Sequence, residues 1–340
     1  MAAPEPELMT LPAWLLAELP ELAALDGPGL LIDHGSVDLL PLQGTDSLRF
    51  LHGQTTQDLA QAVAGSLLRS SAVNASARML ALIDLLVTPD GALVLPVVGI
   101  VAHLATRFDR YIFPADQVSL GALQRRRQVT LLGDPAALLA PLAATPVPAR
   151  SWRALTCNSE EVLVLAGTGL GLPGCRLLLP PRSPLPAALG LLDALGHEAQ
   201  TLLEALVGLP GLGTELSEDH NPYALGLAAT VGRDKGCYVG QETLARLVSY
   251  DGLRRQLRFW RAAEPLPALP RGDRLLDSGG GRLGQVTSRT AHPAGGSYGL
   301  ALLRRAGWSD RQVVLGDGDR RVNLRLHRPL ASSFPTDSMD

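Results

Sequence analysis

One cysteine has surroundings that suit a reactive thiol. The segment 235–242 reads Lys-Gly-Cys-Tyr-Val-Gly-Gln-Glu, and glycines stand on both sides of its Cys237. Glycines let the chain turn tightly and let backbone amides approach a ligand, so we expect a loop at this point. Residues 241–248 have the composition of a helix. Cys237 is therefore expected just before a helix N-terminus, where the helix dipole favours the thiolate form.

The same segment contains Lys235, which is the only lysine of the chain. Every other basic side chain among the 30 lysines and arginines is an arginine. An ammonium differs from a guanidinium in shape, hydration and pKa mobility, so one retained lysine beside a cysteine suggests chemistry. Its positive charge would also favour a thiolate at Cys237, whereas burial in an apolar pocket would oppose it.

The three cysteines do not form a recognisable ligand set. Cys157, Cys175 and Cys237 are an odd number without CxxC spacing, which argues against a disulfide framework and against a self-contained zinc or cluster site. Without local context each reads as a small buried hydrophobe. We therefore expect reduced thiols, no bound metal, and function only at Cys237.

The elements that must position this loop read as a mixture of helices and strands. Residues 45–64 suggest a helix that breaks and restarts, and residues 72–98 form two β-type runs around a Pro-Asp-Gly turn. A helix over 104–111 and a strand over 128–132 follow. Beyond about residue 256, short strands separated by glycines predict a small β-barrel. The fold class is therefore α+β.

A length of 340 residues predicts two or three packed modules. We expect an N-terminal extension with a helix over 1–27 and two interleaved α+β modules over 28–255. A C-terminal β-barrel should occupy 256–330, and a polar, flexible tail 331–340.

Charge and hydropathy exclude several classes of protein. With 30 basic and 33 acidic side chains the net charge is -3, so no global field attracts nucleic acid or acidic membranes. The basic runs at 125–127 and 254–261 read as solvated surface, and no direct nucleic acid binding is expected. The N-terminus lacks a secretory signal, and no uninterrupted apolar stretch is long enough to span a membrane. We expect a cytoplasmic protein.

The segment 235–242, followed by Arg246, resembles the KGCYxGQE signature of YgfZ-type proteins, which are relatives of the glycine-cleavage T-protein. Four further segments are similar to landmarks of that family, namely 44–58, 109–113, 284–288 and 299–301. The resemblance covers roughly residues 28–328. It implies three modules arranged in a ring of the T-protein type, with the small β-barrel at the C-terminal end.

The resemblance also implies that tetrahydrofolate or another folate is the cofactor. Glu204 occupies the place of a family glutamate that serves the pterin, and a carboxylate can accept two parallel hydrogen bonds from it. The family's arginine two positions earlier is Leu202 here. Arg78 can serve the glutamate tail of the folate or can be a structural surface residue. The signature residues expected at the site are Lys235, Gly236, Cys237, Tyr238, Gln241, Glu242 and Arg246.

Two departures from the family concern residues 75–84. The T-protein has an aspartate pair that assists aminomethyl transfer, and the matching residues here are Ala81 and Leu82. Asp84 can substitute only if the strand slips in register, which reverses the facing of every side chain. Ala77 stands where the family usually has glycine, so we expect a slightly different turn.

Three functions stay open on the sequence. The first is a folate-binding accessory protein that supports iron–sulfur cluster assembly or repair, and through it tRNA-modifying iron–sulfur enzymes, with iron–sulfur or cluster-assembly proteins as transient partners. The second is a folate-dependent aminomethyl or one-carbon transferase, to which the missing aspartate pair is an objection. The third is a non-catalytic interaction scaffold with a structural Cys237. Whether the chain is an enzyme is left open.

Overall fold

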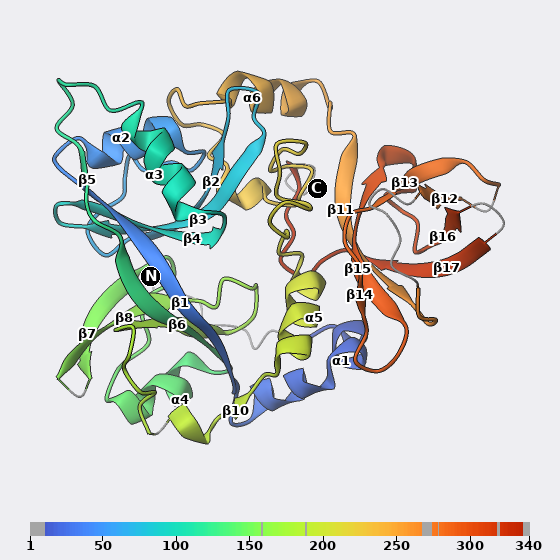
Figure 1. The fold of residues 1–340 in the computed structure, drawn as a ribbon, viewed down its shortest axis with the longest axis horizontal. Helices are drawn as coiled ribbons and strands as arrows, with labels where there is room; N and C mark the ends of the chain where they lie inside the picture. The colour runs from blue at the N-terminus through green and yellow to red at the C-terminus, as the bar shows by residue number, and fades with distance from the viewer. Residues whose placement is uncertain are drawn as a thin grey trace, which may run out of the picture. The chain divides into compact units, whose positions relative to one another are not determined.

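The chain divides into two compact units in a computed structural model. The structure describes residues 11–157, 159–187, 189–266, 274–277, 279–317 and 320–335. Unit 1 consists of Met1–Ser36 and Arg126–Leu203, and unit 2 of Val37–Arg125 and Glu204–Asp340. The chain therefore enters unit 2 twice, as its colours show in Figure 1. None of the helices in these described ranges is long and apolar enough to cross a membrane.

Unit 1 is built on an antiparallel sheet. Its strands follow the order β6 (Gln124–Leu132), β9 (Gly174–Leu179), β8 (Glu160–Ala166) and β7 (Trp152–Cys157). The short β10 (Asp193–Ala194) pairs in parallel with the start of β1 (Leu30–Gln43). The aliphatic core that covers this sheet includes Leu31, Leu131, Val164 and Leu177.

Helical segments of unit 1 are short. They are α1 (Ala13–Glu18), η1 (Pro20–Asp26), α4 (Pro135–Leu139), η2 (Ala140–Leu142), η3 (Leu189–Leu191) and the first part of α5 (His197–Val207). The start of α4 is fixed by its cap, because the Asp134 carboxylate accepts from the amides of Ala136 and Ala137. Pro135 follows at the first helical position, where its missing N–H costs nothing.

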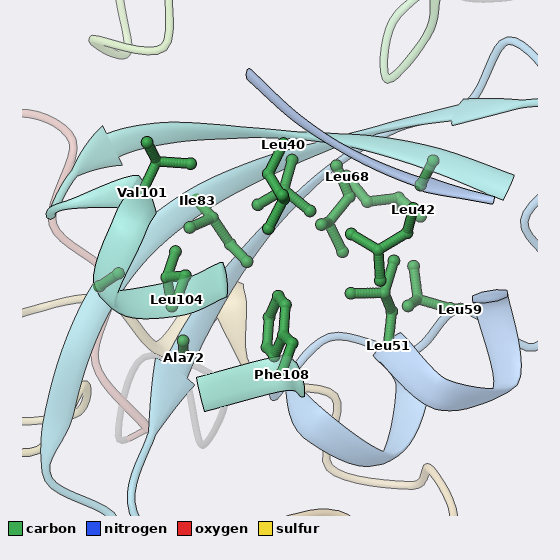
Figure 2. Packing of buried hydrophobic residues seen from close by; sticks show 14 of the residues in the cluster. Leu40, Leu42, Leu51, Leu59, Leu68, Ala72, Ile83, Val101, Leu104 and Phe108 are labelled. Atoms are coloured by element: carbon green, nitrogen blue, oxygen red, sulfur yellow. The ribbon is translucent and has the colours of Figure 1, made fainter. Parts of the chain in front are cut away.

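The first part of unit 2 packs two helices on a sheet. The strands are β2 (Leu67–Val73), β3 (Met79–Thr88), β4 (Gly91–Val98), the second half of β1 and the short β5 (Ser119–Leu120). Helices α2 (Ser47–Gln54) and α3 (Val101–Asp109) contribute Leu51, Leu104 and Phe108, which Figure 2 shows facing Leu40 and Ile83 of the strands. The predicted hairpin is confirmed, since β3 and β4 are joined by a turn after Thr88.

The C-terminal part of unit 2 contains a closed β-barrel. Six strands close it in the order β11 (Arg255–Ala262), β17 (Arg320–His327), β16 (Gln312–Asp317), β12 (Arg274–Leu276), β13 (Arg282–Val286) and β15 (Ser297–Arg304). The pairing of β11 with β15 completes the circle, and β14 (Thr290–Ala291) adds to β15. The short η5 (Arg305–Gly307) follows β15 (Figure 1). The predicted C-terminal β-barrel is confirmed.

Two further helical segments carry the candidate site. They are η4 (Ala228–Thr230) and α6 (Gln241–Ser249), and the chain continues from α6 into β11. The expected flexible tail starts at residue 331. Residues 331–335 pack on unit 2, where Ser333 bridges to Leu227 and Phe334 is 2% exposed. Residues 336–340 lie outside the described part of the chain.

Candidate functional site

Cys237 lies on a loop, residues 231–240, that links η4 to α6, and we call it the Cys237 loop. The thiol is exposed, and α6 begins four residues later at Gln241. Gly240 caps the helix with a φ of 82°. The loop and the helix after it therefore stand where the pattern of glycines predicted them.

Lys235 anchors this loop from inside. Its Nζ donates to the carbonyl oxygens of His52 at 2.5 Å, Thr55 at 2.8 Å and Gln57 at 2.7 Å, in the segment that ends and follows α2. Only 6% of the residue is exposed. The three donors of an ammonium match three converging carbonyls, a set that a planar guanidinium does not reproduce. The shape of this nest explains why the single lysine stands here.

Burial changes the titration of Lys235. Loss of solvent lowers the pKa of its ammonium to about 7, and the nearby carboxylate of Asp58 opposes this only partly. A neutral amine has two N–H donors, so three donated hydrogen bonds belong to the charged form. Lys235 is therefore a clamp whose full set of contacts depends on its proton.

Neighbouring side chains complete the anchoring of the loop. The ring of Tyr238 lies 4.6 Å from the Nζ of Lys235, and burial raises the pKa of its hydroxyl. Gln241 donates from Nε2 to the Lys235 carbonyl at 3.2 Å, and the Val239 amide donates to the Gly53 carbonyl at 3.0 Å. The Gln241 side chain and the Val239 amide therefore hold the backbone on the two sides of the thiol.

Two glycines of the loop are required by space. A Cβ on Gly240 would lie 2.9 Å from the Asn74 carbonyl oxygen, in addition to the strain of its positive φ. A Cβ on Gly232 would lie 3.0 Å from the Asp58 amide nitrogen. At Gly236 the nearest atom would be His52 Nε2 at 3.6 Å, which is an ordinary contact. Among these three glycines, Gly236 is therefore the one at which a side-chain carbon would meet no close contact.

His52 is a neighbour of the site that the sequence did not assign. Its Nδ1 accepts from the Leu59 amide at 3.2 Å, and its carbonyl accepts from Lys235. Burial and the Lys235 charge lower the pKa of its imidazole, while Asp58 raises it. The ring lies beside Gly236, with Nε2 3.6 Å from the place that a Cβ would take there. The sequence contains one sign of this contact, because His52 follows the apolar residues of the family-like segment 44–58. The sequence does not show that it lies near Gly236, because the two residues are far apart in the chain.

Buried hydroxyl groups support the carbonyl nest from below. Thr56 donates from Oγ1 to the Thr230 carbonyl at 2.7 Å, and the hydroxyls of Ser71 and Thr230 lie 2.7 Å apart. The Gly232 amide donates to the Thr56 carbonyl at 2.8 Å. This network connects the start of the Cys237 loop to β2. It also holds in place the segment 52–57, whose carbonyl groups accept from Lys235.

Glu242 and Arg246 lie on the outer face of α6. They form an (i, i+4) ion pair at 2.5 Å, with 78% and 69% of their side chains exposed. Exposed pairs of this kind contribute little to stability. Both residues are therefore available to a ligand, but their present contact is with each other.

Arg78 and Arg246 line one pocket. Its volume is about 600 Å³, and Ala224, Leu247 and Leu253 add apolar surface. Arg78 also donates to the Asp219 carbonyl at 2.7 Å, which fixes its head at the rim. The pocket therefore combines guanidinium groups with an apolar floor.

Glu204 lies on α5, a helix separate from the Cys237 loop and from α6, and it is half-buried. Leu202, which replaces the family's arginine, is 1% exposed and packs in the core with its neighbour Leu203. The helix thus uses position 202 for apolar packing. Glu204 keeps a carboxylate at the position that the resemblance assigns to the pterin.

Strand β3, which matches the strand with the aspartate pair in the T-protein, has no exposed carboxylate at the matching positions 81 and 82. Ala81 is 0% exposed and packs in the hydrophobic core of the sheet. Asp84 is directly opposite Arg69 on β2, and the two side chains form a bidentate ion pair at 2.9 and 3.0 Å. The carboxylate of Asp84 is therefore engaged by a partner within the sheet.

The turn before β3 contains a non-glycine residue with a positive φ. Ala77 adopts a φ of 57°, the left-handed conformation that glycine favours. Asn74 stabilises it, because its Oδ1 accepts from the amides of Ser76 and Arg78, both at 3.0 Å. The chain therefore places an alanine in a backbone conformation that glycine favours, at the position where the resemblance has glycine.

The other two thiols are less accessible than Cys237. Cys175 is 3% exposed on β9, where burial raises the pKa of its thiol to about 12. Cys157 is intermediate in exposure at the end of β7. All three cysteines are free, and Cys237 is the exposed one.

No family model matches the chain. It is 24% identical over 329 residues to a putative chloroplastic transferase of Arabidopsis thaliana, covering 92% of this chain and 75% of that protein. It is 25% identical over 247 residues to the tRNA-modifying protein YgfZ of Colwellia psychrerythraea, covering 71% and 74%. An aminomethyltransferase of Staphylococcus carnosus is 30% identical over 173 residues, which are 50% of this chain and 42% of that protein.

The fold also matches a solved structure. The glycine cleavage system aminomethyltransferase T of Bartonella henselae superposes with a TM-score of 0.74 at 20% identity, covering 94% of this chain and 91% of that one. The predicted T-protein type of fold is therefore confirmed.

Proposed function

We propose that this chain, which is similar over most of its length to a YgfZ protein and has the fold of an aminomethyltransferase T, is a cytoplasmic folate-binding accessory protein. Through Cys237 it supports assembly or repair of iron–sulfur clusters, and thereby tRNA-modifying iron–sulfur enzymes. The observation that carries this proposal is an exposed thiol on a loop that a buried lysine fixes in place. A relative that is named a tRNA-modifying protein adds support.

Cys237 would act as a nucleophile or as a transient ligand. Iron–sulfur clusters usually need four protein ligands, and this chain has three cysteines of which one is exposed. A partner protein must therefore supply the remaining ligands. A fixed loop helps, because a thiol presented in one geometry loses less freedom when the partner docks.

The residues present fit a folate. A pocket of about 600 Å³ is in the range of small-molecule sites, and Arg78 and Arg246 suit the carboxylates of a glutamate tail. Glu204 is not among the residues that line this pocket. Its role rests on the family resemblance, by which its two oxygens would accept from adjacent N–H groups of the pterin. A bound tetrahydrofolate would supply a one-carbon acceptor. The residues described here bind and orient it.

A second candidate is a folate-dependent one-carbon transferase, because two relatives are named as transferases. Position 81 is a buried alanine, and the Asp84 carboxylate is paired with Arg69. Transfer assisted by an aspartate pair at this strand would need a carboxylate from elsewhere. We therefore rank the accessory function first.

Complementation of a strain without its own YgfZ-type protein tests the proposal. Cys237→Ser should abolish complementation and lower the activity of iron–sulfur enzymes, whereas Cys175→Ala should retain both. Glu204→Ala should weaken folate binding in titration calorimetry with tetrahydrofolate, and Lys235→Arg should weaken complementation. Full complementation by Cys237→Ser, with normal iron–sulfur activities, would show that the proposed cysteine mechanism is wrong.

A further inference from the structure

A second pocket lies at the C-terminal end of α6, where the chain passes into the barrel. It shares Tyr250, Gly252, Leu253, Arg254 and Arg255 with the pocket that Arg78 and Arg246 line. The volume of the second pocket is about 710 Å³. Four arginines line it, two at the start of β11 and two at the end of β15 and the start of η5, and we call it the arginine groove. They are Arg254, Arg255, Arg304 and Arg305.

Most of this charge has no internal counterion. Arg305 pairs with Asp251 at 2.5 Å. The guanidinium groups of Arg254, Arg255 and Arg304 have no carboxylate partner among the residues that the structure describes. All three are exposed. The groove thus carries an excess of positive charge in a chain whose net charge is -3.

Two of these arginines are placed against each other by the sheet. Arg255 and Arg304 are directly opposite in the antiparallel pairing of β11 with β15. Like charges at opposite positions of a ladder destabilise it. A β-barrel can place neutral polar side chains at such positions without loss, so the repulsion indicates a surface adapted to an anion.

An aromatic side chain stands at the same groove. Tyr250 lines it and is 81% exposed at the end of α6. Asp251 stops the helix with a φ of 47°, and its ion pair with Arg305 fixes the turn that presents Tyr250. An exposed aromatic ring beside arginines is the combination that binds single-stranded nucleic acids, since bases stack on the ring and phosphates contact the guanidinium groups.

We propose that the arginine groove binds a single-stranded segment of RNA. Phosphates contact Arg255 and Arg304, and a base stacks on Tyr250. An acidic polypeptide would neutralise the arginines but would gain nothing comparable from the aromatic ring. The sequence predicted no direct nucleic acid binding, because the net charge is -3 and the run 254–261 reads as solvated surface. Arg255 and Arg304 are far apart in the chain and become neighbours only through the pairing of β11 with β15.

Fluorescence anisotropy with the full chain and a labelled oligouridylate of about 12 nucleotides tests this at several salt concentrations. Arg255→Gln with Arg304→Gln should reduce the salt slope of log K by roughly 1.4, about 0.7 per lost phosphate contact. Tyr250→Leu should weaken binding by about fivefold or more, because one base stack is lost. Arg125→Gln, an exposed arginine paired with Asp38, is the matched control and should leave binding unchanged.

An oligoglutamate peptide of equal charge tests the alternative that the groove binds an acidic polypeptide. It should compete weakly, and its binding should not change in Tyr250→Leu. If it binds as tightly as the RNA, or if Tyr250→Leu leaves RNA binding intact, the groove serves acidic polypeptides and the proposal is wrong. An equal loss in Arg125→Gln also overturns it. The double arginine variant should melt no lower than the wild type, because it removes a cross-strand repulsion, and each single variant repeats the test.

Discussion

The Cys237 loop and strand β3 are the two places where the resemblance locates chemistry, and their polar groups are arranged in opposite ways. In the loop, the buried Lys235 is bound to backbone carbonyls and the thiol of Cys237 is left exposed. In β3, the polar Asp84 is 1% exposed and is bound by Arg69 from the next strand. In the loop the charged side chain is buried and the thiol is exposed, whereas the Asp84 carboxylate of β3 pairs with the Arg69 guanidinium of β2 within the sheet.

This difference separates the residues that hold the site from those that can react. A side chain whose polar atoms are all occupied by internal partners contributes to position, and an exposed group on a fixed backbone is free for a ligand. By this criterion Lys235 and Asp84 are positioning residues. Cys237 is the group that chemistry can use. Mutations that remove an internal partner should therefore cost stability, in proportion to what they leave unsatisfied.

The largest loss of stability is expected at Lys235. Lys235→Met removes the donor to three carbonyl oxygens, and the free energy of unfolding should fall by about 3 kcal/mol. Chemical denaturation followed by circular dichroism measures the change. Hydrogen exchange should show the loss in the amides of residues 52–59 and in the Cys237 loop. A matched variant, Cys237→Ser, should keep its stability within about 0.5 kcal/mol, and an equal loss there would contradict the division of roles.

A smaller loss is expected in β3. Asp84→Asn leaves the charge of Arg69 without its counterion, but Arg69 retains 26% of its side-chain exposure, so water offsets part of the cost. We expect the free energy of unfolding to fall by about 2 kcal/mol. Alkylation of the exposed thiol should proceed at the wild-type rate. A slower or faster reaction at Cys237 would show that the strand also shapes the site.

Much of the fold could be predicted from patterns that are local in the sequence. The Pro-Asp-Gly turn after Thr88 sets the hairpin, and the Asp134–Pro135 pair starts α4, because each depends on backbone preferences within a few residues. The C-terminal barrel followed from short strands between glycines. Its closure by β11 and β15 did not, since strand pairing depends on contacts that the sequence does not order.

The candidate site could be predicted only within the signature segment 235–242 and the helix after it. The position of Cys237 on a loop and the following helix could both be predicted from these consecutive residues, which also include Lys235. The direction of the lysine side chain could not, because its partners are carbonyl groups, which every residue carries and no sequence pattern marks. The contact of His52 with the site could not be predicted either, because it forms only when residues 52–59 fold against the Cys237 loop.

Titration of Lys235 should make the stability of the protein depend on pH. Its pKa is about 7 in the folded protein and about 10.5 when unfolded, so both states are protonated below pH 7 and the cost of the buried charge is present in full. Between pH 7 and 10.5 the folded state releases its proton first, and stability rises with pH. Relative to Lys235→Arg, which stays charged, the wild type should gain about 1–2 kcal/mol from pH 6.5 to 9 in urea denaturation. Parallel profiles for the two proteins would exclude titration of Lys235 in this range.

The smallest effect is expected where the two regions meet. Ala77 precedes β3 and lies under the loop, since a Cβ on Gly240 would come within 3.1 Å of the Ala77 Cα. Ala77→Gly relieves a left-handed alanine, worth about 1–2 kcal/mol, but loses a buried methyl worth about 0.8 kcal/mol and adds freedom to the unfolded chain. These terms nearly cancel, so the midpoint of urea unfolding should correspond to a change below about 1 kcal/mol. A loss above about 2 kcal/mol would mean that the Ala77 methyl, packed with Tyr223 and Leu244, supports the loop through the core and not through the backbone turn alone.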